Sequence, residues 1–459
     1  MLEVLRDPVH FIGIGGAGMS GLAELALKQG LSVQGSDLKP SHMTKRLTDL
    51  GARIHFGHQS GAVHGAQTIV YSSAIAADNV ELVTAAQAGA HCMHRSDFLA
   101  WLMKYKKAIT IAGTHGKSTT SALIIHVLDA LGEDPTAAIG GTLRAYDSTA
   151  KIGSGSLFVA EADESDGSFL KYSPHLAVIT NIDLDHMEYY KSEDRLLSAF
   201  SSYLGHLDTE GYAIIGWDNP RSRQVGSQFT GQRLTYGFVI GCDVRATNVH
   251  WDGSFTTFNA IVERDLVKVK LRAMGKHNVQ NALCALAVVR ALDLDVKKAA
   301  ESLSTFSGVD RRMTLVHDDN DIKIFDDYAH NPGKVEACIA ALKESFPKHT
   351  LHVVYQPHRY SRLETMYDQM LSSITKADVL YMLPVYAAGE TTDQDFSPQR
   401  LVHDLVSRHQ ITAIACNHIA DAVEKVLARA HSPAVILTVG AGDVHLVASD
   451  LRDVYLEPK

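Results

Sequence analysis

A short glycine-rich segment, IAGTHGKSTT at residues 111–120, has the residue types of a phosphate-binding loop. Gly113 and Gly116 allow backbone N–H groups to wrap a polyphosphate. Lys117 can reach the outer phosphates, and the Ser118 hydroxyl can ligate magnesium. Ile111 stands where the usual motif has its first glycine, so the loop alone names no family. The pattern predicts that ATP or GTP binds to Gly113, Thr114, His115, Gly116, Lys117, Ser118 and Thr119.

Polar side chains follow the next two apolar segments of this part of the chain. Glu161 comes directly after residues 157–160, at the end of an expected strand, where Mg²⁺ on the phosphates would find a hard oxygen ligand. His186 closes a polar stretch after residues 176–180 and can join a second metal ion, with a structural histidine as the alternative. We therefore expect the metal ligands to be Ser118, Glu161 and His186, and we expect Asp163, Glu164 and Asp166 to cap a helix or face solvent.

An alanine- and leucine-rich helix expected from about residue 276 begins with the polar side chains His277, Asn278 and Asn281. Such side chains can hydrogen-bond the edge of an adenine or cap the helix. Both roles stay open, and the first would add these residues to the ATP site.

The last third of the chain has two polar turns after expected strands. Arg359 and Arg362 stand three positions apart at the start of a helix, and this spacing suits a carboxylate because a guanidinium binds it bidentately. A solvated basic turn is the alternative. His330 lies in the other turn, in the segment DDYAHNP.

The N-terminal segment contains a second glycine loop. Gly13, Gly15 and Gly18 form G-x-G-x-x-G between an expected strand and helix, and Asp37 lies near the distance at which an acid meets a ribose hydroxyl. This pattern is also typical of a dehydrogenase, which is an open alternative. Ser72 and Ser73 end a further strand of this segment, where α/β folds place ligands.

The elements that must position these residues indicate an α/β protein with three domains. Residues 1–105 predict a Rossmann-like βαβ domain, and residues 106–312 a P-loop ATPase-like α/β domain with antiparallel strands in 233–273. Residues 313–459 predict a doubly wound α/β domain, because apolar strands alternate there with helices.

Composition limits the classes of partner. The 459 residues suit about three domains, and 46% hydrophobic content excludes general disorder. A net charge of -9 argues against a nucleic-acid or membrane-surface binder, so the partners should be small molecules. Five scattered cysteines fit a reducing cytoplasm. Glycines and Glu24 interrupt the apolar residues 9–27, which argues against a signal peptide.

Taken together, these segments resemble the Mur ligase family. The similar stretches are GIGGAGMSG, GSD, SSAI, AGTHGKSTT, EADESDGSF, NIDLDHMEYY, GKHNVQNA, DDYAHNP and QPHRYSR, and they follow the family's order over nearly the whole chain. The resemblance is strongest to the branch that adds alanine. It implies a domain for a UDP moiety, a central ATPase domain, and a third domain that completes the ATP and amino-acid sites.

The resemblance also implies the reaction: ATP-dependent amide formation between the lactyl carboxylate of UDP-N-acetylmuramate and the amine of L-alanine, with ATP and Mg²⁺ required. The UDP-substrate would then bind at Gly15, Gly16, Ala17, Gly18, Met19, Ser20, Asp37, Ser72 and Ser73. The residues implied in catalysis are Lys117, His330, Arg359 and Arg362. On this interpretation Asp37 is free to contact uridine or ribose.

Some positions depart from the family pattern. Asn331 replaces the second histidine of AHHP, and residues 141–146 (GTLRAY) lack an asparagine expected near the sugar. No lysine occupies the stretch about fifteen residues past His186, where several sister ligases carry a carbamoylated lysine. A murein-tripeptide recycling ligase and a non-catalytic nucleotide-binding regulator are the alternatives, and we expect a monomer or homodimer.

Overall fold

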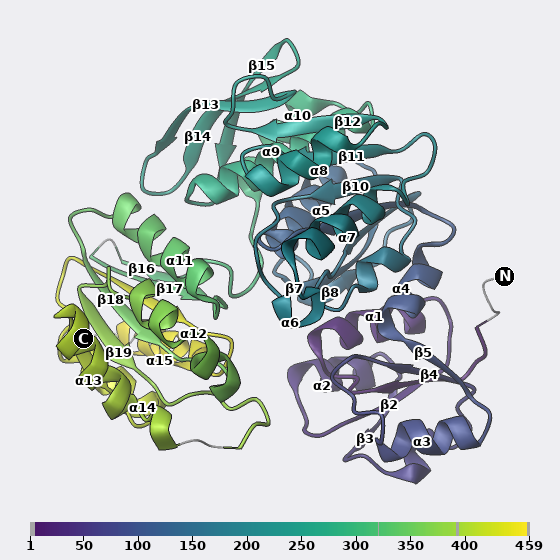
Figure 1. The fold of residues 1–459 in the computed structure, drawn as a ribbon, viewed down its shortest axis with the longest axis horizontal. Helices are drawn as coiled ribbons and strands as arrows, with labels where there is room; N and C mark the ends of the chain where they lie inside the picture. Colours follow the sequence, from purple (N-terminus) through teal and green to yellow (C-terminus); the bar gives the residue numbers. More distant parts are fainter. Residues whose placement is uncertain (1–4, 320, 392–393, 457–459) are drawn as a thin grey trace. The chain divides into compact units, whose positions relative to one another are not determined.

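The computed structural model describes residues 5–319, 321–391 and 394–456. The chain forms two compact units, residues 1–309 and 310–459, and each is described by itself. The first unit contains two β-sheets and the second unit contains one, as expected for an α/β protein of three sheet-bearing domains (Figure 1). Among the described residues, no helix is both long and apolar enough to cross a membrane.

The first sheet is fully parallel and has the strand order β3-β2-β1-β4-β5. Its helices connect successive parallel strands, which confirms the predicted βαβ start. The strands are β1 (Val9–Ile12), β2 (Val33–Asp37), β3 (Arg53–Phe56), β4 (Thr68–Tyr71) and β5 (His91–His94). The helices are α1 (Ala17–Lys28), α2 (His42–Asp49), α3 (Val80–Gln87) and α4 (Arg95–Met103), with a 3-10 turn at Ser60–Val63.

The second sheet has the order β15-β14-β13-β12-β11-β10-β6-β9-β7-β8. Its strands are β6 (Lys107–Ala112), β7 (Thr136–Leu143), β8 (Ser148–Lys151), β9 (Leu157–Glu161), β10 (Leu176–Ile179), β11 (Tyr212–Gly216), β12 (Arg233–Gly237), β13 (Val244–Trp251), β14 (Thr256–Val262) and β15 (Asp265–Leu271). Its helices are α5 (Lys117–Leu131), α6 (Met187–Tyr190), α7 (Glu193–Leu204), α8 (Pro220–Gln228), α9 (Lys276–Ala291) and α10 (Val296–Ser302), with 3-10 turns at Ser168–Lys171 and Leu303–Thr305.

The prediction of antiparallel strands from residue 233 onward was wrong for β12. This strand pairs in parallel with β11 and with β13, and only β13, β14 and β15 form the antiparallel meander. β12 extends the parallel sheet because helix α8 forms a crossover between β11 and β12.

The sheet of the second unit has the order β16-β17-β21-β18-β19-β20 and is parallel except for β16. This confirms the predicted doubly wound domain. The strands are β16 (Thr314–Asp318), β17 (Ile322–Asp327), β18 (Thr350–Tyr355), β19 (Val379–Met382), β20 (Thr412–Ala415) and β21 (Ala434–Val439). The helices are α11 (Pro332–Ser345), α12 (Tyr360–Ser373), α13 (Pro398–His409), α14 (Ile419–Leu427) and α15 (His445–Leu456), with a 3-10 turn at Gln394–Phe396.

Helix α1 and the hairpin of β7 and β8 join the two sheets of the first unit. Glu24 of α1 is 3% exposed and accepts hydrogen bonds from Arg46 and from Ser148, the latter at 2.7 Å. Burial alone would raise the pKa of Glu24, but these hydrogen bonds lower it below its ordinary value. A Cβ at Gly21 would lie 2.6 Å from the Thr149 Oγ1, so a larger residue would separate helix and hairpin.

Candidate active site

The phosphate-binding loop lies between β6 and α5, as the sequence predicts. Gly113 and Gly116 have φ values of +127° and +82°, which a residue with a Cβ rarely adopts. A Cβ at Gly113 would lie 2.2 Å from the Thr180 Oγ1, and one at Gly116 would lie 2.8 Å from the Asn281 Oδ1. Both glycines are therefore required by backbone conformation and by close neighbours.

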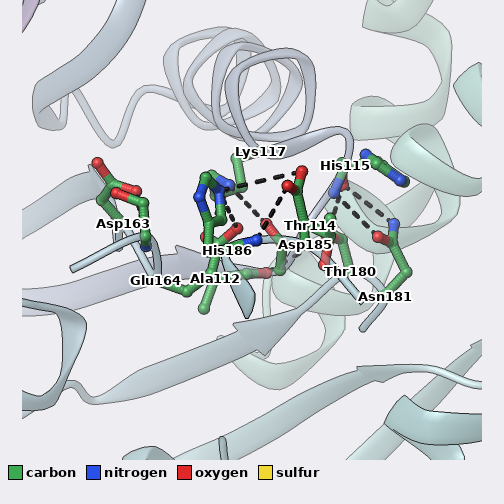
Figure 2. A network of polar contacts seen from close by, with 12 residues as sticks. Ala112, Thr114, His115, Lys117, Asp163, Glu164, Thr180, Asn181, Asp185 and His186 are labelled. Carbon is green, nitrogen blue, oxygen red and sulfur yellow. Dashed lines mark hydrogen bonds and ion pairs between the residues drawn. The ribbon is translucent and has the colours of Figure 1, made fainter. Parts of the chain in front are cut away.

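Asn181, directly after β10, holds the loop in shape (Figure 2). Its side chain accepts a hydrogen bond from His115 N at 2.9 Å and donates one to the His115 carbonyl at 3.0 Å. Thr114 N donates to the Asn181 carbonyl, and Thr180 Oγ1 donates to the His115 carbonyl. The end of β10 thus fixes Thr114 and His115 before any nucleotide binds.

Lys117 forms a buried ion pair that the sequence analysis did not predict. Its Nζ donates to the Gly113 carbonyl at 2.6 Å and to Glu164 Oε2 at 2.7 Å. The Glu164 side chain is 2% exposed, so the expectation that Glu164 caps a helix or faces solvent was wrong. Burial alone would lower the pKa of Lys117, but the attraction of Glu164 and Asp163 raises it above its ordinary value, so the lysine stays charged.

The other two acids of this segment are also engaged. Asp163 Oδ2 accepts a hydrogen bond from Arg95 at 2.9 Å, and Asp166 Oδ2 accepts one from Ser73 at 2.6 Å. Arg95 begins α4 and Ser73 follows β4, both in the first domain, so both acids link the two domains of the first unit rather than facing solvent. Asp166 Oδ1 also accepts from Ser168 N, but Gly167 and not Asp166 is the N-cap of the 3-10 turn that follows.

Two of the three expected metal ligands lie beside neighbouring glycines of β7. Gly140 N donates to Glu161 Oε1 at 3.0 Å, and a Cβ at Gly141 would lie 3.9 Å from the Ser118 Cβ. A hydroxyl and a carboxylate fit Mg²⁺, which is usually held by one or two protein oxygens together with phosphates and water. No group of three or more His, Cys, Asp or Glu side chains among the described residues could hold a metal by itself.

His186, the third expected ligand, has acidic neighbours. Its Nε2 lies 4.0 Å from Glu164 Oε1 and 4.0 Å from Asp185 Oδ2, and its Nδ1 lies 3.7 Å from Glu188. These contacts place His186 beside the partner of Lys117.

The polar residues at the start of α9 divide into two groups. Asn281 Oδ1 accepts a hydrogen bond from Thr120 at 3.0 Å, and its Nδ2 donates to Asn278, so it ties α9 to α5. Asn278 donates to the Met274 carbonyl at 2.8 Å. Both asparagines are buried, whereas His277 is exposed. Of the three, His277 is therefore the one whose side chain is free to meet a ligand.

The glycine loop of the first sheet is closed by Asp37. One carboxylate oxygen accepts from Gly15 N at 2.8 Å and the other from Leu38 N at 2.7 Å. Each carboxylate oxygen keeps a further lone pair, so a contact of Asp37 with uridine or ribose stays a prediction. A Cβ at Gly15 would lie 2.9 Å from Asp37 Oδ2, so only glycine fits at this position.

Helix α1 begins at Ala17, directly after Gly16. The first N–H groups of a helix have no intrahelical acceptor, so those of Ala17 and Gly18 can meet an anion. Met19 and Ser20 are buried, and their N–H groups donate to the Gly16 carbonyl, which gives them a structural role.

Ser72 and Ser73 follow β4 as expected. Ser73 is exposed, and its Oγ, besides donating to Asp166, lies 3.1 Å from His94 Nε2. The side chain of Arg95, which follows His94, lies against the glycine loop, since a Cβ at Gly18 would be 3.4 Å from its Nη1. Arg95 was not identified from the sequence, because no motif surrounds it.

In the second unit, the structure brings His330, His358 and Arg362 together. The rings of His330 and His358 have centroids 5.6 Å apart, and Arg362 Nη1 lies 3.4 Å from His358 Nδ1. Tyr386 stacks on His358 with centroids 5.7 Å apart. Arg359 is exposed and precedes α12 with a φ of 67°, while its N–H donates to the Tyr386 carbonyl.

The protonation of His330 follows from its surroundings. Its Nδ1 lies 3.0 Å from the Tyr328 carbonyl and must donate to it, so Nε2 is left as the acceptor. Burial, together with the charges of Arg362 and Lys334, holds the pKa of His330 well below its ordinary value. A base this weak favours orientation of a substrate over proton acceptance at neutral pH.

Comparison with known proteins gives one consistent result. Three family models match in succession: "Mur ligase family, catalytic domain" at residues 8–107, "Mur ligase middle domain" at 111–289 and "Mur ligase, glutamate ligase domain" at 311–442. The UDP-N-acetylmuramate–L-alanine ligase of Sorangium cellulosum is 39% identical over 450 residues, which cover 97% of this chain and 95% of that protein.

Two solved structures have the same fold. The crystal structure of UDP-N-acetylmuramate-alanine ligase from Thermotoga maritima has a TM-score of 0.85 and 27% identity, and covers 99% of this chain and 100% of that one. A murein peptide ligase from Psychrobacter arcticus has a TM-score of 0.72 and 23% identity, covers 98% and 99%, and supports the fold alone. With all three family models matched in order, the chain belongs to the Mur ligase family and is an ATP-dependent, amide-forming ligase.

Proposed function

We propose that this chain joins L-alanine to the lactyl carboxylate of UDP-N-acetylmuramate, at the expense of ATP, in the synthesis of peptidoglycan precursors. The observation that carries the proposal is that this chain is 39% identical, over 97% of its length, to the UDP-N-acetylmuramate–L-alanine ligase of Sorangium cellulosum. The arrangement of Lys117 and the phosphate-binding loop supports it, because a ligase of this kind must first transfer a phosphoryl group.

The reaction has two steps. A carboxylate is a poor acylating agent, so the γ-phosphoryl group of ATP is transferred to the lactyl carboxylate, giving an acyl phosphate and ADP. The amine of L-alanine then attacks the acyl carbon, and inorganic phosphate leaves. Lys117 offsets the charge of the phosphoryl group during transfer, and the loop N–H groups orient it.

Ser118 and Glu161 would hold Mg²⁺, which would neutralise charge on the phosphates. His186 is proposed to serve a second metal ion. The residues of the phosphate-binding loop are proposed to bind the phosphates of ATP, and His277 is proposed to contact the adenine.

The UDP moiety is proposed to bind in residues 1–105, at the N-terminus of α1. The N–H groups of Ala17 and Gly18 and the positive end of the helix suit a diphosphate. Asp37 shapes this loop by accepting the Gly15 N–H. The proposed ATP domain spans residues 106–312, and residues 313–459 are proposed to supply the amino-acid site. Free cysteines at all five positions support a reducing cytoplasm, and we propose a monomer or homodimer.

Arg359 and Arg362 are proposed to bind the carboxylate of L-alanine. A guanidinium recognises a carboxylate bidentately, whereas the N–H of Ser361 in the first turn of α12 already donates to Glu390. The acceptor Nε2 of His330 would then receive a hydrogen bond from an N–H of the neutral amine, which has lost its proton to solvent, and orient its lone pair for attack.

Phosphate release tests the proposed function against the murein-tripeptide ligase. We expect release from ATP and UDP-N-acetylmuramate to be stimulated by L-alanine and by no other compound in a panel of amino acids that includes L-Ala-γ-D-Glu-diaminopimelate. Stimulation by the tripeptide alone would assign the chain to peptide recycling. No phosphate release with any acceptor, despite ATP binding, would favour the nucleotide-binding regulator.

Loss of a metal ligand should appear as a raised magnesium requirement. We expect Glu161→Ala to raise the Mg²⁺ concentration for half-maximal activity by about tenfold, because Mg²⁺ then loses one of few protein oxygens. His186→Ala should shift it in the same direction. Magnesium titrations of phosphate release measure the effect, with the exposed Glu210→Gln as a control. Titrations that overlay those of the parent would show that Glu161 and His186 are structural.

A further inference from the structure

Glu164 is a buried carboxylate that the reaction described above does not use. It lies in the segment after β9, the strand that pairs directly with β6 in the sheet, so this segment and the phosphate-binding loop end at the same edge. Its Oε2 lies 2.7 Å from Lys117 Nζ. Lys117, the cation assigned to the phosphates, is therefore paired with Glu164 in this structure.

The two oxygens of Glu164 are unequally satisfied. Oε2 accepts from Lys117, whereas Oε1 is buried without a hydrogen-bond partner among the described residues. His186 Nε2 lies 4.0 Å from Oε1. A buried carboxylate with one unsatisfied oxygen is held less firmly than a fully bonded one, so its contact with Lys117 is open to competition.

The main chain of Glu164 is fixed independently of this contact. Its carbonyl accepts a hydrogen bond from Tyr190 Oη and another from Gly167 N at 3.2 Å. When Lys117 turns to a phosphate, the Glu164 backbone therefore keeps its place, and the carboxylate stays close to the incoming negative charge.

We propose that Glu164 is a positioning residue of the ATP site: it holds the Lys117 ammonium over the loop, and the outer phosphates of ATP must displace its carboxylate to reach that ammonium. This inference rests on the proposed function of Lys117. It predicts that loss of a residue from the ATP site increases the affinity for ATP. Removing the Glu164 charge removes both a competitor for Lys117 and a repulsion of the phosphates, so ATP should bind more tightly.

The test is calorimetry of ATP binding without Mg²⁺, in EDTA, so that no effect on a metal ligand contributes. We expect Glu164→Gln to lower the Kd for ATP by about tenfold, the size of effect that one unit charge a few ångströms away produces in a partly shielded site. AMP lacks the outer phosphates, so its Kd should change little. Glu210→Gln removes the same charge from an exposed position and should change neither Kd.

Thermal unfolding gives a second measurement. Glu164→Gln leaves Lys117 buried without its partner, so the free protein should melt at a lower temperature, and ATP should raise the Tm by more than it does for the parent. If Glu164→Gln does not fold, Glu164→Asp is used. Its shorter side chain weakens the contact with Lys117, and the gain in ATP affinity should then be smaller but present.

The outcomes separate this inference from the proposed function. If the parent binds no ATP under any condition, the proposed function fails. If the parent binds ATP, and Glu164→Gln or Glu164→Asp binds it equally or more weakly, Glu164 is a structural partner of Lys117 and the positioning role is wrong. A gain that is equally large for AMP would also overturn it, because the outer phosphates would then not be the competing group.

Discussion

Lys117→Ala is expected to abolish phosphoryl transfer while the protein still folds. Removal of one charge-stabilising group from such a site typically reduces the rate by about 10²- to 10³-fold, and Lys117 is the cation that the loop presents to the phosphates. The rate of phosphate release at saturating ATP, UDP-N-acetylmuramate and L-alanine measures the loss. The exposed Lys297→Ala serves as a matched control and should keep the parent rate.

Because Lys117 is paired with Glu164, Lys117→Ala should also reduce the stability of the protein. Lys117→Ala leaves a carboxylate that is 2% exposed without its partner, and breaking a buried pair costs about 3–5 kcal/mol of stability. The double variant Lys117→Ala/Glu164→Gln removes the orphaned charge, so we expect it to regain part of the lost stability and to stay inactive. Near-normal turnover in either variant would contradict the role assigned to Lys117.

Replacing Arg359 or Arg362 by alanine is expected to raise the KM for L-alanine by about 10- to 100-fold, the range that corresponds to losing a charge-assisted hydrogen bond. The affinities for ATP and UDP-N-acetylmuramate should change little. Initial rates over a series of L-alanine concentrations measure the effect. Arg452→Ala, in the same unit, removes a half-exposed arginine that pairs with its neighbour Asp453, and should leave the KM unchanged.

Alaninamide sharpens this test, because it keeps the amine and lacks the carboxylate. The parent should use it poorly, and the difference between alanine and alaninamide should shrink in the arginine variant that removes the clamp. Arg362→Ala also frees His358 Nδ1, so Arg359→Ala is the simpler of the two variants. If both variants keep the alanine KM and lose ATP affinity, the arginines belong to the nucleotide site.

The architecture and the phosphate-binding loop could be predicted because the signals are local. Gly113, Gly116 and Lys117 stand within five consecutive residues, and the strand and helix around them have clear apolar patterns. The direction of β12 could not be predicted in this way. Alternation of polar and apolar residues indicates that one face of a strand is buried, and it does not indicate whether the neighbouring strand runs parallel or antiparallel.

The ion pairs of the site depend on tertiary structure and left no sequence signal. Glu164 meets Lys117 across 47 positions, and Arg95 meets Asp163 across 68. An acid in a polar segment such as EADESDG is normally solvated, so nothing in its composition distinguished the buried Glu164 from its neighbours. For this reason the sequence does not predict that Glu164 is the buried ion-pair partner of Lys117.

The close seam between α1 and the β7–β8 hairpin limits how this chain can be recombined with its relatives. A chimera that takes its first hundred residues from another ligase imports a new α1, yet keeps Ser148 and Thr149 in the hairpin. Thr149 tolerates only glycine at position 21, and Ser148 hydrogen-bonds Glu24. The first and second domains are therefore exchangeable only when both residues of each pair, Gly21 with Thr149 and Glu24 with Ser148, come from the same protein.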